Sequence, residues 1–449
     1  MTKDMTVGSP MQLILKFSIP LLFGNILQQM YNLIDSIIVG QYLGLSALSS
    51  VGATGSITFL IIGFCTGTCC GFAIPVAQQF GAGKYSNMRK YVMNAAYLSV
   101  VFSIIMTIAT VILCRPILTL MKTPEQFYEG AYIYLIVIFI GIPFTFLYNI
   151  VSGIIRAMGD SKTPFYFLVV ATVINIVLDL LFIIVFKWGI AGAGLATIIA
   201  QGVAGALCLV YMKKRYDILR TQHDERRFDK GFCKTLIVMG VPMGLQYSIT
   251  AIGSIMMQAS VNLLGDIYVS VVSVGGKIKQ FAMCPYDAFA TASSTYCGQN
   301  LGAGKVERIG KGVFSAVFVS VVYSVVVAVV LIIWGADISL IFVDKDQTDV
   351  IALTAKFLAC AGPFYVFLAI LNNVRMSIQG LGYSGLSMIA GVSELFARGV
   401  MSLWVIPELG FIAACYADQA AWLIAATCVV VMYFIIMKKI NQNIKLKKD

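Results

Sequence analysis

Long apolar runs follow one another along the whole chain and are separated by short polar or Gly/Pro-containing breaks. An α-helix of about 20 mainly apolar residues is long enough to cross the hydrocarbon core of a bilayer. The pattern therefore predicts an all-α integral membrane protein with twelve transmembrane helices. The expected spans are residues 13–39, 51–80, 91–114, 131–155, 164–186, 190–212, 235–263, 269–297, 312–335, 351–376, 384–406 and 410–437.

Composition and charge support this interpretation. Of 449 residues, 59% are hydrophobic and only 12% are charged, whereas soluble domains carry about 25% charged residues. A net charge of +11 would favour a nucleic-acid partner in a soluble protein. Here the lysines and arginines gather in alternate loops, which is typical of cytoplasmic loops. We therefore expect a multi-pass protein of the cell membrane, with both termini cytoplasmic and with no nucleic-acid partner.

The basic residues decide this orientation. The segments assigned to the inner side carry Lys3 and Lys16, Lys84, Arg89 and Lys90, Arg156 and Lys162, the run from Lys213 to Lys234, Lys305, Arg308 and Lys311, and the tail from Lys438 to Lys448. The outer loops carry only Arg115, Lys122, Lys187 and Lys345.

The chain also repeats itself. Gln79–Lys84, after the second span, reads QFGAGK and recurs as NLGAGK at Asn300–Lys305, after the eighth. Pro20 is matched by Pro242, and Pro143 by Pro363, at a nearly constant offset. We predict an N-terminal lobe (1–212, spans 1–6), a cytoplasmic linker (213–234) and a C-terminal lobe (235–449, spans 7–12 with the basic tail). Six spans per copy give both lobes the same orientation, with a central cleft between them.

An acidic residue, Asp35, lies within the first span. A charge in hydrocarbon costs about 2.5–3.5 kcal/mol on insertion scales, so Asp35 needs a partner or a function. Asn175 and Asp179 lie one helical turn apart on the fifth span, and Ala193 and Thr197 repeat that spacing on the sixth. At about 1.5 Å per residue, Asp35, Asp179 and Thr197 lie roughly 7, 10 and 12 Å from the outer ends of their spans. We predict an oxygen cage for a small hard cation, or a shared proton.

The second half differs at the equivalent positions. With the spans aligned, Asn175 and Asp179 correspond to Glu394 and Arg398, and Thr197 corresponds to Asp418. We predict that Glu394, Arg398 and Asp418 form a buried charge network that neutralises itself. The spans of the first half carry two acids and no basic partner for them, so their cation must come from outside the chain.

The remaining chemistry is sparse. His223 is the only histidine, and the 11 cysteines are scattered without a paired metal-binding spacing. No nucleophile–base set lies in the spans, so we expect neither an enzyme nor an organic cofactor. Gly81–Lys84 lacks the length and the preceding strand of a phosphate-binding loop, and it is interpreted as a helix C-cap turn.

Several stretches together resemble the multidrug and toxic compound extrusion (MATE) family over essentially the full length. They are Ile19–Pro20, Tyr31–Asp35, Arg156–Pro164, Asn175–Asp179, Gly189–Thr197 and the repeated turn ending in Gly-Ala-Gly-Lys. The resemblance implies a secondary active multidrug exporter that exchanges organic, cationic or amphipathic compounds for entering Na⁺ or H⁺.

The resemblance also implies roles for residues. Asp35, Asn175, Asp179, Thr197 and the backbone carbonyl of Ala193 resemble the family's cation site, which could hold Na⁺. Pro20 resembles the proline at which the first span bends when that site is occupied. One branch of the family has acids in spans 7 and 10, where this chain has Gln246, and Asn372 with Asn373. Whether the C-terminal lobe takes part in coupling is therefore left open, as is the choice between Na⁺ and H⁺.

We expect small-molecule substrates, the bilayer as partner, and a monomer. Candidate substrate contacts are Tyr31, Gln246, Met256, Met257, Tyr286 and Asp287, because methionine and aromatic side chains suit a pocket that can repack. The alternative function is a flippase for lipid-linked oligosaccharides, which should line its cleft with cations. Lys277 and Lys279, which have no obvious acid nearby in the sequence, are the main observation in its favour.

Overall fold

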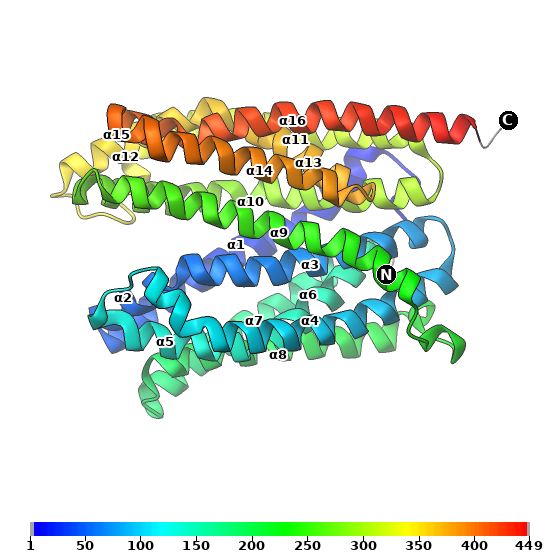
Figure 1. The fold of residues 1–449 in the computed structure, drawn as a ribbon, viewed down its shortest axis with the longest axis horizontal. Coiled ribbons are helices and arrows are strands. Elements are labelled where there is room, and N and C mark those ends of the chain that lie inside the picture. The colour runs from blue at the N-terminus through cyan, green and yellow to red at the C-terminus, as the bar shows by residue number, and fades with distance from the viewer. Residues whose placement is uncertain (1–3, 447–449) are drawn as a thin grey trace. The chain divides into compact units, whose positions relative to one another are not determined.

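The computed structural model describes residues 4–446, and within them the chain forms α-helices joined by short 3₁₀ and π segments, without β-strands (Figure 1). The all-α prediction is confirmed. Lys3, Lys447 and Lys448, which belong to the predicted basic termini, lie outside the described residues.

Ten helices within residues 4–446 are long and apolar enough to cross a membrane, and a bent pair of helices brings that number to 11. Helix α10 (Asp266–Gly302), which corresponds to the predicted eighth span, is not among them although it is 37 residues long. Its exposed face is polar, as described below. The prediction of a polytopic membrane protein is confirmed, and the count of twelve spans stays a prediction.

The described chain divides into two compact units. Unit 1 contains Phe23–Ser248, and unit 2 contains Met5–Leu22 and the residues from Ile249 onward. Two long helices, α1 (Pro10–Leu43) and α9 (Lys230–Asn262), therefore each contribute one part to either unit. The predicted lobe boundaries at residues 212 and 235 stay a prediction.

Unit 1 is a bundle in which α3 and α8 both pack against α6, and α7 packs against α8. These helices are apolar on most sides, as expected for segments that bury one face in protein and turn the other to lipid. Its elements are α2 (Leu45–Ala53), α3 (Gly55–Gly81), α4 (Tyr85–Leu120), α5 (Glu125–Ile140), α6 (Ile142–Ala157), α7 (Lys162–Leu180), the π segment η1 (Leu181–Val185), α8 (Gly189–Arg215), η2 (Asp217–Leu219) and η3 (Asp224–Arg226).

Unit 2 is built around α10 and α13, which pack against each other, with α11 and α16 also packed against α13. Large aromatic side chains fill its core, including Tyr365 stacked on Trp422 with ring centroids 5.7 Å apart. Its elements are α10, α11 (Val306–Ser339), α12 (Thr348–Ala361), η4 (Gly362–Phe364), α13 (Tyr365–Gly380), α14 (Ser384–Val400), the π segment η5 (Met401–Val405), α15 (Ile406–Leu409) and α16 (Phe411–Lys445).

The sequence repeat has the same geometry in both units. After α3, Gly83 has φ 66° and the Lys84 N–H donates to the Gln79 carbonyl at 3.1 Å. After α10, Gly304 has φ 70° and the Lys305 N–H donates to the Asn300 carbonyl at 2.9 Å. A positive φ at the residue after a helix is the glycine C-cap arrangement. The predicted C-cap turn is thus confirmed.

One predicted span is not a continuous helix. The span 131–155 consists of α5 and α6, which meet at Gly141 with a bend of 47°. Pro143 stands in the first turn of α6, where a missing N–H breaks no intrahelical hydrogen bond. Pro363, its counterpart in the repeat, stands in the same position in η4, where the span 351–376 changes from α12 to α13. The repeated prolines therefore start new helical segments.

Glycines bring α3 close to the part of α9 that belongs to unit 1. Gly67 and Gly71 on α3, and Gly240 and Gly244 on α9, have the small-xxx-small spacing of closely packed membrane helices. A Cβ added at Gly71 would lie 2.5 Å from the Gly240 Cα, and one added at Gly67 would lie 2.7 Å from the Met243 carbonyl oxygen. This backbone contact accepts no side chain on either helix.

Candidate functional site

Three polar side chains meet in the interior of unit 1. Asp35 comes from α1, and Asn175 and Asp179 come from α7; they are 7%, 1% and 0% exposed. Asp35 and Asp179 are close enough to interact electrostatically. Among the described residues, Oδ1 of Asp35, Oδ1 of Asn175 and both carboxyl oxygens of Asp179 are buried without a hydrogen-bond partner. Buried oxygens of this kind are costly unless another group satisfies them.

A chain of hydroxyl groups links α1 to α8 beside these acids. The Tyr31 hydroxyl donates to Thr197 Oγ1 at 2.9 Å, and Thr197 Oγ1 donates to the Ala193 carbonyl at 3.1 Å. Tyr31, which we expected at the substrate, interacts electrostatically with both Asp35 and Asp179. The structure therefore brings Tyr31 together with the five residues predicted for the cation site.

Tyr134 of α5 is a further neighbour that sequence reasoning missed. Its side chain is buried and lies within electrostatic range of Asp35 and Asp179. The sequence around it contains several tyrosines and offers no signal that singles this one out. Only the packing of α5 in unit 1 identifies it.

The donor set of this site fits a small hard cation or a shared proton. It offers oxygen atoms from two acids, Asp35 and Asp179, and from Asn175 and Thr197. In the described part of the chain, neither acid forms an ion pair with a lysine or arginine. Clusters of three or more His, Cys, Asp or Glu side chains, which would suit a transition metal, are absent from residues 4–446. The two acids therefore form an anionic site that lacks a cation of its own.

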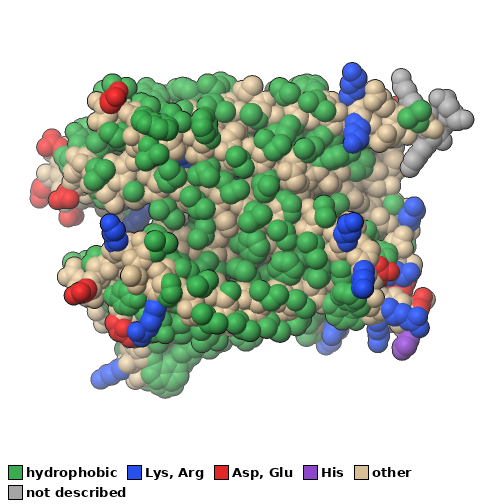
Figure 2. Space-filling model, in the orientation of Figure 1, with side chains coloured by type: hydrophobic (Ala, Val, Ile, Leu, Met, Phe, Trp, Pro, Cys, Tyr) green, Lys and Arg blue, Asp and Glu red, His purple; other side chains and the backbone are tan. Residues whose placement is uncertain are grey.

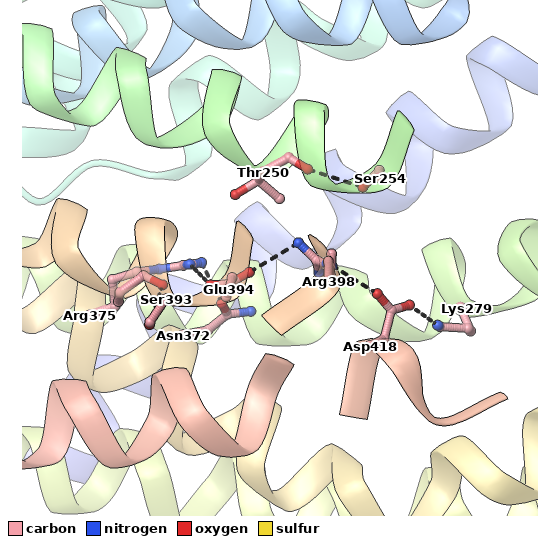
Figure 3. A network of polar contacts seen from close by, with 10 residues as sticks. Thr250, Ser254, Lys279, Asn372, Arg375, Ser393, Glu394, Arg398 and Asp418 are labelled. Carbon is pink, nitrogen blue, oxygen red and sulfur yellow. Dashed lines mark hydrogen bonds and ion pairs between the residues drawn. The ribbon is translucent and has the colours of Figure 1, made fainter. Parts of the chain in front are cut away.

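In unit 2 the acids Glu394 and Asp418 are paired with basic side chains, in contrast to the acids of unit 1 (Figure 3). Arg398 joins the two acids of the predicted network, with Nε 3.1 Å from Asp418 Oδ1 and Nη1 3.4 Å from Glu394 Oε2. Lys279 of α10 closes one end, with Nζ 2.5 Å from Asp418 Oδ2. Lys279 has no obvious acid nearby in the sequence, but α10 and α16 pack it against Asp418 across 139 positions.

Arg375 of α13 closes the other end of this network. Its Nη1 lies 2.8 Å from Glu394 Oε1, and its Nη2 donates to Asn372 Oδ1 at 2.7 Å. Three cations and two acids thus form one connected chain within the described part of unit 2. Asn372 serves as an acceptor for Arg375.

Helix α10 presents a polar stripe on its exposed face. Ser273, Gln280 and Asp287 are exposed, Ser294 is half-buried, and the four recur every seven residues, which places them on one side of the helix. None of these four side chains makes a hydrogen bond or ion pair with another described residue. The exposed face of α11 carries Phe314, Phe318 and other large apolar side chains instead. The α10 stripe is therefore suited to water or a polar ligand rather than to lipid.

The other residues predicted as substrate contacts, and the predicted hinge Pro20, are buried or half-buried. Tyr286 is fully buried and donates to Ser324 Oγ at 2.9 Å, so it is a packing residue in this structure, and its contact with substrate stays a prediction. Gln246 is buried in unit 1. Met256 and Met257 are half-buried in unit 2. Pro20 is buried inside α1, in the part that belongs to unit 2.

The fold is that of a polytopic helical membrane protein. The family model MatE matches the chain twice, over residues 20–181 and 242–404. The chain therefore belongs to the MATE family of multidrug efflux transporters, as its resemblance implied.

Individual relatives and a solved structure support the assignment to this family. A probable multidrug resistance protein, YpnP, from Bacillus subtilis is 30% identical over 90% of this chain and 88% of its own length. NorM from Thermotoga maritima, also a probable multidrug resistance protein, is 22% identical over 82% of this chain and 80% of its own. A crystal structure of a MATE protein in complex with MaL6 has the same fold, with a TM-score of 0.90, 20% identity, and coverage of 98% of this chain and 100% of that one.

Proposed function

We propose that this protein is a secondary active antiporter that exports organic, cationic or amphipathic compounds in exchange for entering Na⁺ or H⁺, by alternating access. The observation that carries this proposal is the pair of buried, unpaired acids, Asp35 and Asp179, in unit 1. An intramembrane acid without a basic partner is, by default, a hypothesis of a functional site. The relatives that are named as multidrug resistance proteins support the export of small molecules.

In this proposal the entering ion is what neutralises the acid pair. Two like charges that are both buried are stable only when a cation or a proton joins them. Asp35 and Tyr31 lie on the same part of α1, and Tyr31 reaches α8 through Thr197. Ion entry then repacks this part of α1, with a bend at Pro20, and lowers the affinity for substrate. Substrate must weaken ion binding by the same factor, because the coupling is reciprocal.

The polar stripe of α10 supports a substrate role for Asp287. Asp287 is an exposed carboxylate in the middle of α10, the predicted eighth span, and the basic side chain that influences it electrostatically, Arg375, is already paired with Glu394. A free carboxylate of this kind attracts organic cations. The flippase alternative has less support, because Lys279, Arg375 and Arg398 each form an ion pair with a carboxylate.

The proposal includes the location, oligomeric state and topology of the protein. The protein acts as a monomer in the cell membrane, with both termini cytoplasmic and with lobes at 1–212 and 235–449. The alternation of basic and non-basic loops supports this orientation. A green fluorescent protein fused after Asp449 should fluoresce in cells if the C-terminus is cytoplasmic.

The test is transport by Asp35→Asn in proteoliposomes with an imposed Na⁺ or pH gradient. We expect the variant to lose gradient-driven efflux of an organic cation such as ethidium, because the neutral amide removes half of the charge that attracts the ion. Asp344→Asn, which neutralises an exposed acid in a loop, is the matched control and should transport normally. Gradient-driven efflux at the wild-type rate by Asp35→Asn would overturn the proposal.

A further inference from the structure

The linker between the sequence repeats is folded onto unit 1 rather than being a free loop. Glu225 in η3 is buried and accepts two hydrogen bonds from Arg89 of α4, from Nε and Nη2, each at 2.6 Å. Arg89 Nη1 also donates to the Ile218 carbonyl at 3.2 Å. The bidentate bond from Arg89 lowers the pKa of Glu225 to about 2, so Glu225 stays charged and the ion pair stays intact at neutral pH.

Further along α4, two more side chains hold the linker backbone. The Tyr97 hydroxyl donates to the Arg226 carbonyl at 2.7 Å, and the Asp229 N–H donates to Asn94 Oδ1 at 2.9 Å. Asn94 and Tyr97 lie about 14 and 18 Å along α4 from its first residue, Tyr85, at about 1.5 Å per residue. The segment 226–229 is therefore fixed beside α4, well inside the end of that helix.

The fixed backbone turns an unusual set of side chains outward. Phe228 is 61% exposed, and its basic neighbours Arg226, Arg227 and Lys230 are exposed as well. Figure 2 shows basic side chains gathered around the only histidine, His223, which belongs to the same linker. One exposed ring is ordinary on a protein surface, but next to a bilayer it can enter an apolar environment that water does not supply.

That environment is adjacent along α4. About one turn beyond Tyr97, the exposed side chains of α4 become apolar, beginning with Val100 and Val101, which are 59% and 49% exposed. The segment 226–230 therefore lies at the level where the polar end of unit 1 gives way to its lipid-facing surface. Aromatic and basic side chains at this level are typical of contacts with lipid headgroups.

We propose that Arg226, Arg227, Lys230 and Phe228 form a binding site for the headgroups of anionic phospholipids in the leaflet next to the linker. The basic side chains bind the phosphate groups, and Phe228 inserts at the base of the headgroups. Clustered basic residues next to a membrane helix attract anionic lipids in this way.

The neighbouring acids do not cancel this cluster. Glu225 is neutralised by Arg89, and Asp229 Oδ1 accepts hydrogen bonds from the N–H groups of Gly231 and Phe232 at the start of α9. Arg226 donates through Nε to Thr221 Oγ1 at 3.0 Å, which orients its guanidinium group while leaving further donors available. Asp224 and Asp229 are both exposed and reduce, without cancelling, the positive charge of the three basic side chains.

The experiment measures lipid binding to the purified full-length protein in an uncharged detergent. Short-chain dihexanoyl phosphatidylglycerol and dihexanoyl phosphatidylcholine are titrated separately by thermophoresis. We expect the wild type to prefer phosphatidylglycerol by about tenfold, with the preference falling as NaCl is raised, because salt screens exposed charges. The triple variant Arg226→Gln, Arg227→Gln, Lys230→Gln should bind both lipids within about twofold of each other.

A matched variant removes the same charge elsewhere. Lys122→Gln, Lys187→Gln, Lys345→Gln alters three basic residues in the loops assigned to the opposite side and should keep the wild-type preference. Phe228→Ser should weaken both lipids alike, since it removes the apolar contact and leaves the charges. Gradient-driven efflux by each variant reports that the chain is folded.

Three results would overturn the proposal. One is a wild type without a preference for phosphatidylglycerol. Another is a triple variant that keeps the preference. The third is displacement of phosphatidylglycerol by millimolar inorganic phosphate, which would assign the site to a free anion. All three leave the proposed antiport intact, because they do not involve Asp35 or Asp179.

Discussion

At the scale of single residues, the two units treat buried charge differently. In unit 1, Asp35 and Asp179 face each other without a basic partner among the described residues. In unit 2, Glu394 and Asp418 are tied to arginine and lysine side chains. A buried acid that is already paired cannot easily accept a visiting cation, because its partner would be left unpaired. The acids of unit 1 are therefore suited to bind an ion, whereas the acids of unit 2 stabilise the packing of their helices.

This contrast predicts unequal effects within the unit 2 network. Asp418→Asn leaves Lys279 without an anionic partner and Arg398 with Glu394 alone, so we expect a loss of about 3–5 kcal/mol of stability. Lys279→Met should cost less, because Asp418 keeps its bond to Arg398 at 3.1 Å. Thermal unfolding of the two purified variants in detergent, side by side with wild type, makes the comparison. Equal losses from both would contradict the assignment of Asp418 as the centre of the network.

Some of these residues could be predicted from sequence, and others could not. Asp35, Asn175 and Asp179 could be singled out because a charged or amide side chain in an apolar run is conspicuous. Tyr134 could not, because a tyrosine in an apolar helix is ordinary and only the packing of α5 puts it near the acids. The same holds for the ion pair between Lys279 and Asp418, which depends on how α10 packs against α16 rather than on any local spacing.

At the scale of helices, the hydrophobic pattern predicts where helices lie but not how they bend or pack. The hydrophobic pattern predicted the existence of the membrane helices and the approximate position of each. It did not predict the bend between α5 and α6, because both sides of Gly141 are equally apolar. Nor did it predict the linker fold, which depends on the bond from Arg89 to Glu225 across 136 positions.

The contact between α3 and α9 can be tested with one methyl group. Gly71→Ala would place a Cβ 2.5 Å from the Gly240 Cα, and backbone cannot rotate away as a side chain can, so we expect a loss of about 1–3 kcal/mol and lower expression. Gly310→Ala, inside α11, is the control, because a Cβ there has nothing within 4 Å. It should be neutral or stabilising by about 0.5–1 kcal/mol. A stable Gly71→Ala protein would show that the two helices can separate without cost.

At the scale of the whole molecule, two helices belong to both compact units. α1 passes from unit 2 into unit 1 after Leu22, and α9 passes from unit 1 into unit 2 after Ser248. Each carries a proline a few residues before the change, Pro20 in α1 and Pro242 in α9. The sequence repeat shows that the two prolines are equivalent, but the sequence alone does not show which unit each half of a helix packs against.

These two prolines have different consequences in the proposed mechanism. A proline inside a helix removes one backbone hydrogen bond and makes bending there easier. Pro20 precedes the half of α1 that carries Tyr31 and Asp35, so a bend there moves groups of the acid site. Pro242 precedes the half of α9 that carries Met256 and Met257, which lie outside that site. Bending at Pro20 is therefore the one that ion binding should control.

Pro20→Ala restores an N–H that can bond the Lys16 carbonyl, which stiffens α1 and should slow gradient-driven efflux by about tenfold without lowering stability. Pro242→Ala makes the same change in α9 and should slow efflux less. Pro116→Ala, inside α4 within unit 1, controls for the loss of a helical proline away from both changes of unit and should transport normally. Initial efflux rates of the three variants, measured under identical gradients, show which substitution slows transport most. If Pro20→Ala transports as fast as Pro116→Ala, bending of α1 is not the step that links the acid pair to export.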